Sequence, residues 1–166
     1  MKHLLIFDFD GVLSPIPVSD TYNYKTRKPY DQTINLIKKL YETNDYIMVI
    51  ASFNDYAHKI IKEWGLQSHF LCERSGCIQN KKKYNSYNSY YNNVELCKVK
   101  QINNMWNNEL FYLQDTIKSV TFYDDDYDNI NKVKQMNNIP NINAVLIDSK
   151  LGFDYDNFDI DIDILL

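Results

Sequence analysis

The stretch Leu4–Val12 constrains the fold most strongly, because an apolar run there ends in two carboxylates and a glycine. Such an unbroken run is typical of a strand buried on both faces of a parallel sheet. Asp8 and Asp10 follow it, and burying an ionised carboxylate without a partner is costly. We therefore expect both acids at the carboxyl end of the strand, the edge where open parallel sheets bind ligands. Both can reach one site only if the chain unwinds at Gly11; the alternative is an ordinary strand with an acidic turn.

Apolar runs alternate with amphipathic segments along the rest of the chain, which is typical of a parallel sheet with crossover helices. The predicted fold class is α/β, a Rossmann-like three-layer sandwich with a mostly parallel sheet of about five strands. Strands are expected over 3–9, 46–51, 70–72, 120–123 and 144–147. Helices are expected from a cap at Asp31 to Asn44, and over 55–64, 95–107 and 128–136.

The length of 166 residues predicts a single domain, 1–166. The Tyr/Asn-rich segment 81–93 is expected to be a loop, and the acidic tail 153–166 an edge strand or a docked tail. We expect a cytoplasmic protein, because no apolar stretch is long enough for a bilayer and the start shows no separate signal segment. The heavy use of Asn, Tyr, Ile and Lys indicates an AT-rich genome, as in some viruses and microbes.

Composition argues against several classes of site and partner. The net charge of −4 disfavours a general nucleic-acid or membrane-surface binder. The cysteines at 72, 77 and 97 lack Cys-x-x-Cys spacing, so neither a disulfide framework nor a zinc site is indicated. The histidines are scattered without ligand spacing, and the tail lacks the glycine and final glutamate of a calcium loop.

Polar side chains follow three of the predicted strands. Asp8 and Asp10 follow the first, Ser52 ends the second, and Asp124–Asp126 follow the fourth. The carboxyl ends of parallel strands share one edge, so these carboxylates would repel one another there. A hard divalent cation relieves that repulsion, and Mg²⁺ typically binds a few carboxylates together with a substrate phosphate. The sequence therefore predicts a Mg²⁺ site at this edge.

The order of these groups resembles the four motifs of the haloacid dehalogenase-like phosphohydrolases. The motifs are Asp8-Phe9-Asp10-Gly11-Val12, a hydrophobic strand ending at Ser52, a lysine, and Phe122-Tyr123-Asp124-Asp125-x-x-x-Asn129-Ile130. The resemblance spans residues 3 to 148. The first and last motifs are specific in combination, whereas the serine alone is a weak signal.

The resemblance implies a Mg²⁺-dependent phosphomonoester hydrolase that forms an aspartyl-phosphate intermediate at Asp8. Asp10 would protonate the leaving group and then activate water, and its backbone carbonyl would face the metal. Ser52 would hydrogen-bond the transferring phosphoryl group, and Asp124 and Asp125 would complete the metal site with Asp8 and Asp10. These roles agree with physical chemistry, because a carboxylate attacks phosphorus only where cations neutralise the phosphoryl oxygens.

The lysine of the third motif, which would bind phosphate and balance the acidic charge, is best matched by Lys98. A buried helix face follows it at Val99, Ile102 and Met105. Lys100 and Lys118 are the alternatives.

The acids at the start of the last predicted helix, Asp126 and Asp128, suit the positive end of a helix dipole. Asn129 is expected to orient the same loop. The short segment between Gly11 and the first helix leaves no room for a folded cap domain, so the spacing resembles the capless, small magnesium-dependent phosphatases. An open site of that type suits a large phosphorylated substrate, or a partner that supplies a lid.

Two further functions stay open. Lys81, Lys82 and Lys83 precede several tyrosines and are compatible with a polynucleotide 3′-phosphatase or a nucleotidase, although a polar insertion is the favoured interpretation. A non-enzyme could be a response-regulator receiver or an inactive dehalogenase-like scaffold that serves as an interaction module. Receivers carry their phosphorylated aspartate after a middle strand, whereas the middle strand here ends on Ser52, which favours the hydrolase.

Overall fold

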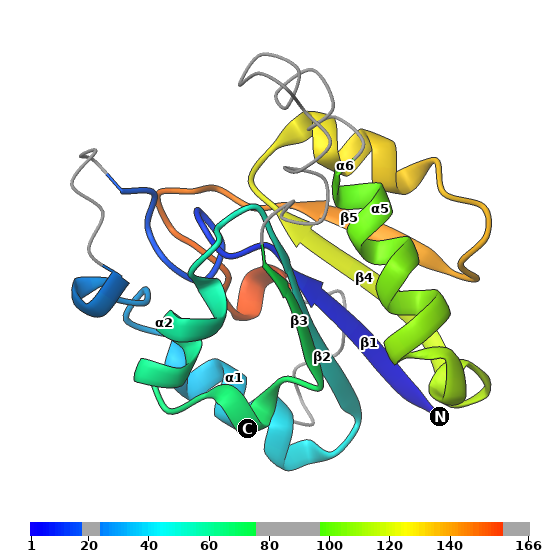
Figure 1. The fold of residues 1–166 in the computed structure, drawn as a ribbon, viewed down its shortest axis with the longest axis horizontal. Coiled ribbons are helices and arrows are strands. Elements are labelled where there is room, and N and C mark those ends of the chain that lie inside the picture. The colour runs from blue at the N-terminus through cyan, green and yellow to red at the C-terminus, as the bar shows by residue number, and fades with distance from the viewer. Residues whose placement is uncertain (18–23, 76–96, 158–166) are drawn as a thin grey trace.

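The computed structural model describes residues 1–17, 24–75 and 97–157. Five strands form one sheet in the order β3-β2-β1-β4-β5, and every neighbouring pair is parallel (Figure 1). The strands are β1 (Lys2–Phe7), β2 (Tyr46–Ser52), β3 (Cys72–Ser75), β4 (Ile117–Asp124) and β5 (Ile142–Leu146). The α/β prediction with a parallel sheet is therefore confirmed. This strand order is that of the doubly wound Rossmann-like sheet, whereas receivers follow the order 2-1-3-4-5. The topology thus excludes the receiver fold.

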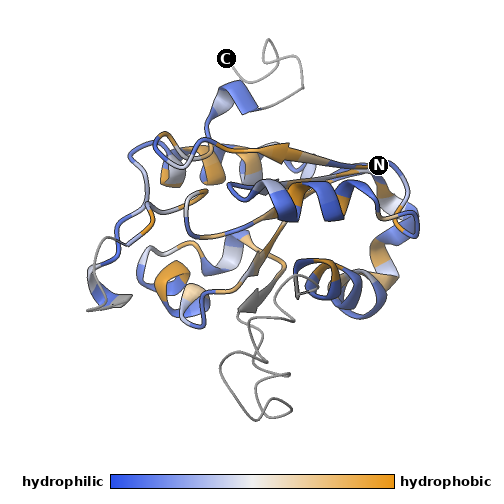
Figure 2. Cartoon of the chain, turned by 90° about the horizontal axis from the view of Figure 1, so that it is seen from above, coloured by the Kyte–Doolittle hydropathy of each residue, from blue (hydrophilic) through white to orange (hydrophobic). Residues whose placement is uncertain are grey.

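Helices cover both faces of the sheet. The helices α1 (Thr33–Thr43) and α2 (Ala57–Glu63) share a buried apolar cluster with Leu5 and Phe7 of β1. The helices α5 (Cys97–Asn104) and α6 (Tyr127–Lys134) share the other cluster with Leu4 and Ile6. Alternate residues of β1 therefore enter opposite cores, which explains why the strand is apolar at every position from Leu4 to Phe7. Figure 2 shows the strands coloured mainly as hydrophobic between helices of mixed character.

Short helical turns connect these elements. Four are 3₁₀ helices, over Tyr24–Thr26, Gln67–His69, Phe111–Thr116 and Tyr155–Asn157. A π-helical turn, Met105–Glu109, extends α5. Among the described residues, no helix combines the length and the apolar character that crossing a membrane requires.

The first helix begins differently from the prediction. Asp31 was expected to cap it, but the residue before its first turn is Gln32, whose side chain makes no capping hydrogen bond. The chain is instead anchored by the buried Thr33, whose hydroxyl donates to the carbonyl of Leu13 over 3.2 Å. Asp31 is left exposed in the preceding turn. The predicted end of this helix at Asn44 is confirmed, because that residue adopts a left-handed conformation with φ 59°.

Two strand boundaries also move. The first strand ends at Phe7 rather than Phe9. The amide of Asp8 still donates to the carbonyl of Tyr123, but the chain then turns, and the amide of Gly11 donates to the carbonyl of Ser14. The third strand is Cys72–Ser75 instead of 70–72. Its register with β2 begins at the pair Val49 and Cys72, so only the last expected residue lies in the strand.

The expected loop 81–93 and most of the acidic tail 153–166 lie outside the described residues. Segment 81–93, with Lys81, Lys82 and Lys83, falls entirely outside them, as does the tail from 158 onward. The described start of the tail docks on the fold through Phe153, which is fully buried, and Tyr155, which packs against the same core. Cys72 is half-buried and packs against the cluster that contains Leu4 and Ile6.

Candidate active site

The predicted acids and the serine lie at one edge of the sheet. Phe7 of β1 pairs with Ile50 of β2 and with Tyr123 of β4, so the three strands end near one another. Asp8 and Asp124 directly follow the paired positions, Ser52 lies two residues beyond Ile50, and all three are buried. The carboxyl edge of the sheet thus carries the cluster that the strand-end pattern predicts.

Three carboxylates form the centre of the site. One oxygen from each of Asp8, Asp124 and Asp125 lies within 4.8 Å of the others. Burial, and then the charge of Asp8, raise the pKa of Asp125 to about 6. Burial also raises the pKa of Asp124, to about 7, although the charge of Lys98 opposes that shift. The site therefore holds negative charge at an energetic cost that a cation would remove.

Lys98 of α5 supplies positive charge from within the protein. Its ammonium donates to Oδ1 of Asp8 and to the carbonyl of Ala51, both over 2.5 Å, and lies 3.6 Å from Oδ2 of Asp124. It also lies 4.6 Å from the centroid of the Phe53 ring. Burial opposes the charge of this fully buried group, but the two carboxylates outweigh burial and raise the pKa of Lys98. Lys98 is consequently a cation at neutral pH.

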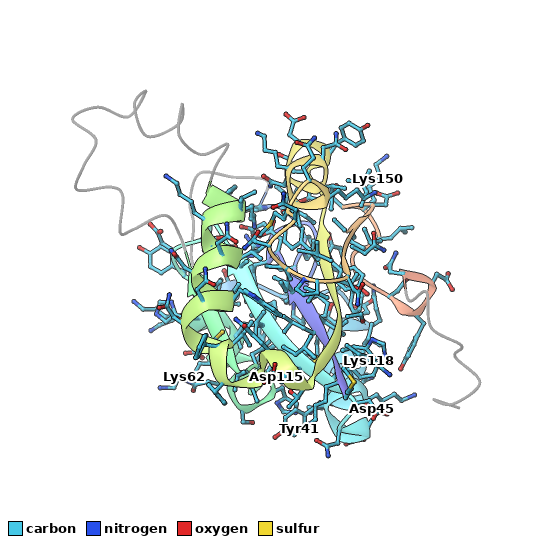
Figure 3. The ribbon with its side chains drawn as sticks, turned by 90° about the vertical axis from the view of Figure 1, so that its right-hand side faces the viewer. Tyr41, Asp45, Lys62, Asp115, Lys118 and Lys150 are labelled. Atoms are coloured by element: carbon cyan, nitrogen blue, oxygen red, sulfur yellow. The ribbon has the colours of Figure 1, made fainter. Side chains whose placement is uncertain are left out.

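The other two lysines lie elsewhere. Lys100 is exposed on α5. Lys118, near the start of β4, lies at the amino-terminal end of the sheet beside Asp45 and far from Lys150, as Figure 3 shows. The structure therefore brings only Lys98 of these three candidates to the acids.

The loop after β4 holds Asp124 in place. The side-chain amide of Asn129 donates to Oδ2 of Asp124 over 3.1 Å, and the backbone amide of Asp126 donates to Oδ1 over 2.8 Å. Asp126 also caps α6, because its carboxylate accepts from the amides of Asp128 and Asn129. Asp126 and Asn129 thus order the loop, as the sequence suggests.

Gly11 gives Asp125 access to the site. Gly11 has φ +78°, a conformation that side-chain-bearing residues rarely adopt. A Cβ atom at this position would overlap the carboxylate of Asp125. The unwinding expected at Gly11 therefore also makes room for a second acid.

The carboxylate of Asp10 binds two donors. Arg27 binds its Oδ1 as an ion pair, and the side-chain amide of Asn54 donates to Oδ2 over 3.0 Å. Burial raises the pKa of Asp10, whereas the Arg27 charge lowers it. The Asp10 carboxylate, held by Arg27 and Asn54, is thus not one of the three clustered carboxylates, and for a metal the resemblance implies only its backbone carbonyl.

The end of β2 is held from α5. Ser52 is 1% exposed, and its hydroxyl oxygen accepts from the amide of Asn54 over 3.1 Å. The side chain of Gln101 donates to the carbonyl of Ser52 over 2.8 Å. Gln101 lies one helical turn after Lys98, so both side chains bind consecutive carbonyls at the end of β2.

Sequence reasoning missed Arg27, Asn54 and Gln101. Gln101 had a usable signal, because its spacing of three from Lys98 places both on one helix face. Asn54 follows Ser52 closely, but nothing in the pattern distinguishes it from an ordinary turn residue. Arg27 lies in a polar segment without periodicity and carries no local signal.

The donor set suits the predicted metal. The cluster offers carboxylate oxygens, which Mg²⁺ and other hard cations prefer, and lacks the Cys and His ligands typical of zinc. Because burial and mutual repulsion raise the pKa of Asp124 and Asp125, a bound dication would hold both in the ionised form. The residues present therefore fit a Mg²⁺ site.

A hollow at the opposite edge of the sheet does not belong to this cluster. It has a volume of about 770 Å³ and is lined by α1, the start of β2 and the turns Gln67–His69 and Phe111–Thr116, including Tyr41, Tyr46, His69 and Tyr112. None of the acids described above lines it. The chemistry-bearing residues and this aromatic hollow are separate features.

Comparison with known proteins gives similarity in structure only. No protein-family model matches the chain, and no curated protein matches it at a significant level. A haloacid dehalogenase-like hydrolase from Streptococcus pneumoniae superposes with a TM-score of 0.56 at 12% identity, covering 93% of this chain and 89% of that one. A candidate phosphatase from Clostridium difficile superposes with a TM-score of 0.54 at 12% identity, covering 94% and 89%. The chain therefore has the haloacid dehalogenase-like fold.

Proposed function

We propose that this protein is a Mg²⁺-dependent phosphomonoester hydrolase that works through an aspartyl-phosphate at Asp8. The observation that carries the proposal is the contact between the buried Lys98 ammonium and Oδ1 of Asp8, beside two further carboxylates. A carboxylate needs nearby positive charge to approach an anionic phosphoryl group. This cluster supplies one fixed cation and a place for a second.

Each residue has a role in the proposed reaction. An oxygen of Asp8 attacks phosphorus, and the bond between phosphorus and the leaving oxygen breaks as the carboxyl group of Asp10 gives that oxygen its proton. The Asp10 carboxylate then takes a proton from water, whose oxygen attacks phosphorus. The bond to Asp8 breaks, and inorganic phosphate leaves. The reaction thus needs one group to serve as acid and then as base.

Two other side chains would hold the phosphoryl group. Ser52 accepts a hydrogen bond from the amide of Asn54, which leaves its own proton to donate to a phosphoryl oxygen. Lys98 would share its charge between Asp8 and the phosphate. Mg²⁺, when bound by Asp8, Asp124 and Asp125, would neutralise phosphoryl oxygens as a Lewis acid.

Hydrolysis of a generic aryl phosphate tests the proposal. We expect Mg²⁺-dependent release of phosphate that a chelator abolishes and that Asp8→Asn removes. Asp31→Asn is the matched control, because Asp31 is an exposed carboxylate in the turn before α1 and is not one of the clustered acids. Full activity in Asp8→Asn would refute the mechanism, and a wild-type protein without activity on any phosphate ester would favour an inactive scaffold.

The substrate class needs a separate experiment. The panel should contain phosphorylated sugars, nucleotides, phosphotyrosine peptides and 3′-phosphorylated oligonucleotides. It includes both small and macromolecular substrates, so that either size of substrate can be recognised. Preference for the oligonucleotide would favour the polynucleotide 3′-phosphatase alternative.

A further inference from the structure

Arg27 is a nearly buried arginine whose side chain points into the turn that carries Asp10. Its side chain is 10% exposed, and Nη2 binds Oδ1 of Asp10, the hydroxyl of Ser14 at 2.9 Å and the carbonyl of Pro15 at 2.7 Å. Its Nε donates to the same Ser14 hydroxyl over 3.1 Å. One guanidinium therefore joins the acid to the turn that follows it.

The backbone of Arg27 is fixed as well. The indole nitrogen of Trp64, at the end of α2, donates to the carbonyl of Arg27 over 3.0 Å. The Trp64 ring stacks on Phe9 with centroids 5.3 Å apart, and the Arg27 guanidinium lies 5.7 Å from the centroid of the same Phe9 ring. Phe9 separates the two catalytic aspartates in sequence, so Arg27 is held by the same elements that hold the site.

The hydroxyl of Ser14 gives a further tie, because it donates to the carbonyl of Lys28 over 2.8 Å. Residues 27 and 28 are thereby fastened to the turn after β1 at two adjacent positions. The guanidinium reaches its three acceptors because its donors are arranged in a rigid planar fork. A lysine ammonium is a point charge on a flexible stem and would not reproduce this arrangement.

We propose that Arg27 is a positioning residue that fixes the orientation of the Asp10 carboxyl group for its acid and base steps, an inference that rests on the proposed function. A group that serves two steps has to lie within hydrogen-bond reach of the leaving oxygen and later of the attacking water. Asn54 holds one oxygen of Asp10 and Arg27 the other, so the carboxylate cannot rotate freely. Arg27 acts through Asp10, whose Oδ1 it binds, and Asp10 is not one of the three clustered carboxylates.

A double-mutant cycle between Arg27 and Asp10 tests this role. We expect Arg27→Ala to lower kcat by about 10- to 100-fold, with a much smaller change in KM, because a misplaced acid–base group loses most of its effect. In the Asp10→Asn background the same substitution should change kcat by less than about threefold, since the group that Arg27 positions is already disabled. Arg27→Lys should recover little of the loss, because it restores the charge but not the fork.

Lys28→Ala is the matched control, since it removes a positive charge from an exposed side chain of the same segment, and we expect it to keep wild-type kcat. Equal losses from Arg27→Ala in both backgrounds would overturn the positioning role, as would full activity in Arg27→Lys. If Arg27→Ala does not fold, Arg27→Lys in both backgrounds gives the same comparison. Absence of phosphatase activity in the wild type would overturn the proposed function itself, which separates the two failures.

Discussion

The ammonium of Lys98 lies 2.5 Å from Oδ1 of Asp8, although the two residues are 90 positions apart in the chain. The contact joins the end of β1 to the first turn of α5 across β2, whose Ala51 carbonyl accepts from the same ammonium. Lys98 also contacts both Asp8 and Asp124, so one buried cation balances negative charge at the ends of two strands. The charge balance of Asp8 and Asp124 therefore depends on Lys98 together with any bound dication.

Replacing Lys98 should therefore affect both stability and activity. We expect Lys98→Met to destabilise the protein by about 3 to 5 kcal/mol at pH 8, because it leaves buried carboxylates without their cation. The loss should shrink at pH 5.5, where those carboxyl groups can take up protons. Denaturant unfolding at the two pH values measures the difference, and phosphatase activity should fall by at least about 100-fold. Lys100→Met, on the exposed face of α5, is the control, and equal losses in both variants would contradict the role of Lys98.

Stability without metal should decrease as the pH rises through the range where the clustered acids ionise. The pKa values of Asp124, about 7, and Asp125, about 6, are raised above the ordinary value of 3.8. Between these values and 3.8 the folded protein binds more protons than the unfolded chain, so these groups stabilise it at low pH and lose that contribution toward pH 7. Mg²⁺ should consequently raise Tm more at pH 7.5 than at pH 5.5. A thermal shift that is equal at both pH values would rule out these carboxylates as the ligands.

Local patterns in the sequence were sufficient for the fold and for most of the cluster. Acids that directly follow a buried apolar strand lie at the carboxyl edge of the sheet, so the positions of Asp8 and Asp124 could be predicted from the strands before them. Lys98 was chosen as the lysine that the resemblance implies, because a buried helix face follows it. These features are encoded within one strand or one helix, where periodicity reports burial directly.

The remaining parts depend on contacts between segments that have no periodicity. Arg27 approaches Asp10 from a polar, proline-rich stretch, whose position depends on contacts with Ser14 and with Trp64, which packs on Phe9. The start of α1 was missed for a similar reason, since Thr33 anchors it through a carbonyl from a distant turn rather than through a local cap. Tertiary contacts of this kind leave no signal in a single sequence.

Gly11→Ala should impair the site beyond the strain that it introduces. Gly11 and Gly65 have similar backbone angles, φ +78° and +72°, so alanine is strained at both positions. A Cβ atom at Gly65 would meet open space, whereas at Gly11 it would overlap the carboxylate of Asp125. We expect both variants to lose about 1 kcal/mol of stability. Only Gly11→Ala should also need a higher Mg²⁺ concentration for half-maximal thermal stabilisation, and an unchanged Mg²⁺ requirement would show that Asp125 does not need this space.

Asn129→Ala should weaken Mg²⁺ binding while leaving the metal-site carboxylates in place. Its side-chain amide donates to Oδ2 of Asp124 over 3.1 Å, and partners that orient a ligating carboxylate typically contribute about 10- to 100-fold in metal affinity. A Mg²⁺ titration followed by thermal shift should give a midpoint higher by that factor, and activity should recover in part at saturating Mg²⁺. Asn137→Ala, at an exposed position beyond α6, is the matched control. A midpoint that stays at the wild-type value would mean that the backbone amide of Asp126 alone is enough to orient Asp124.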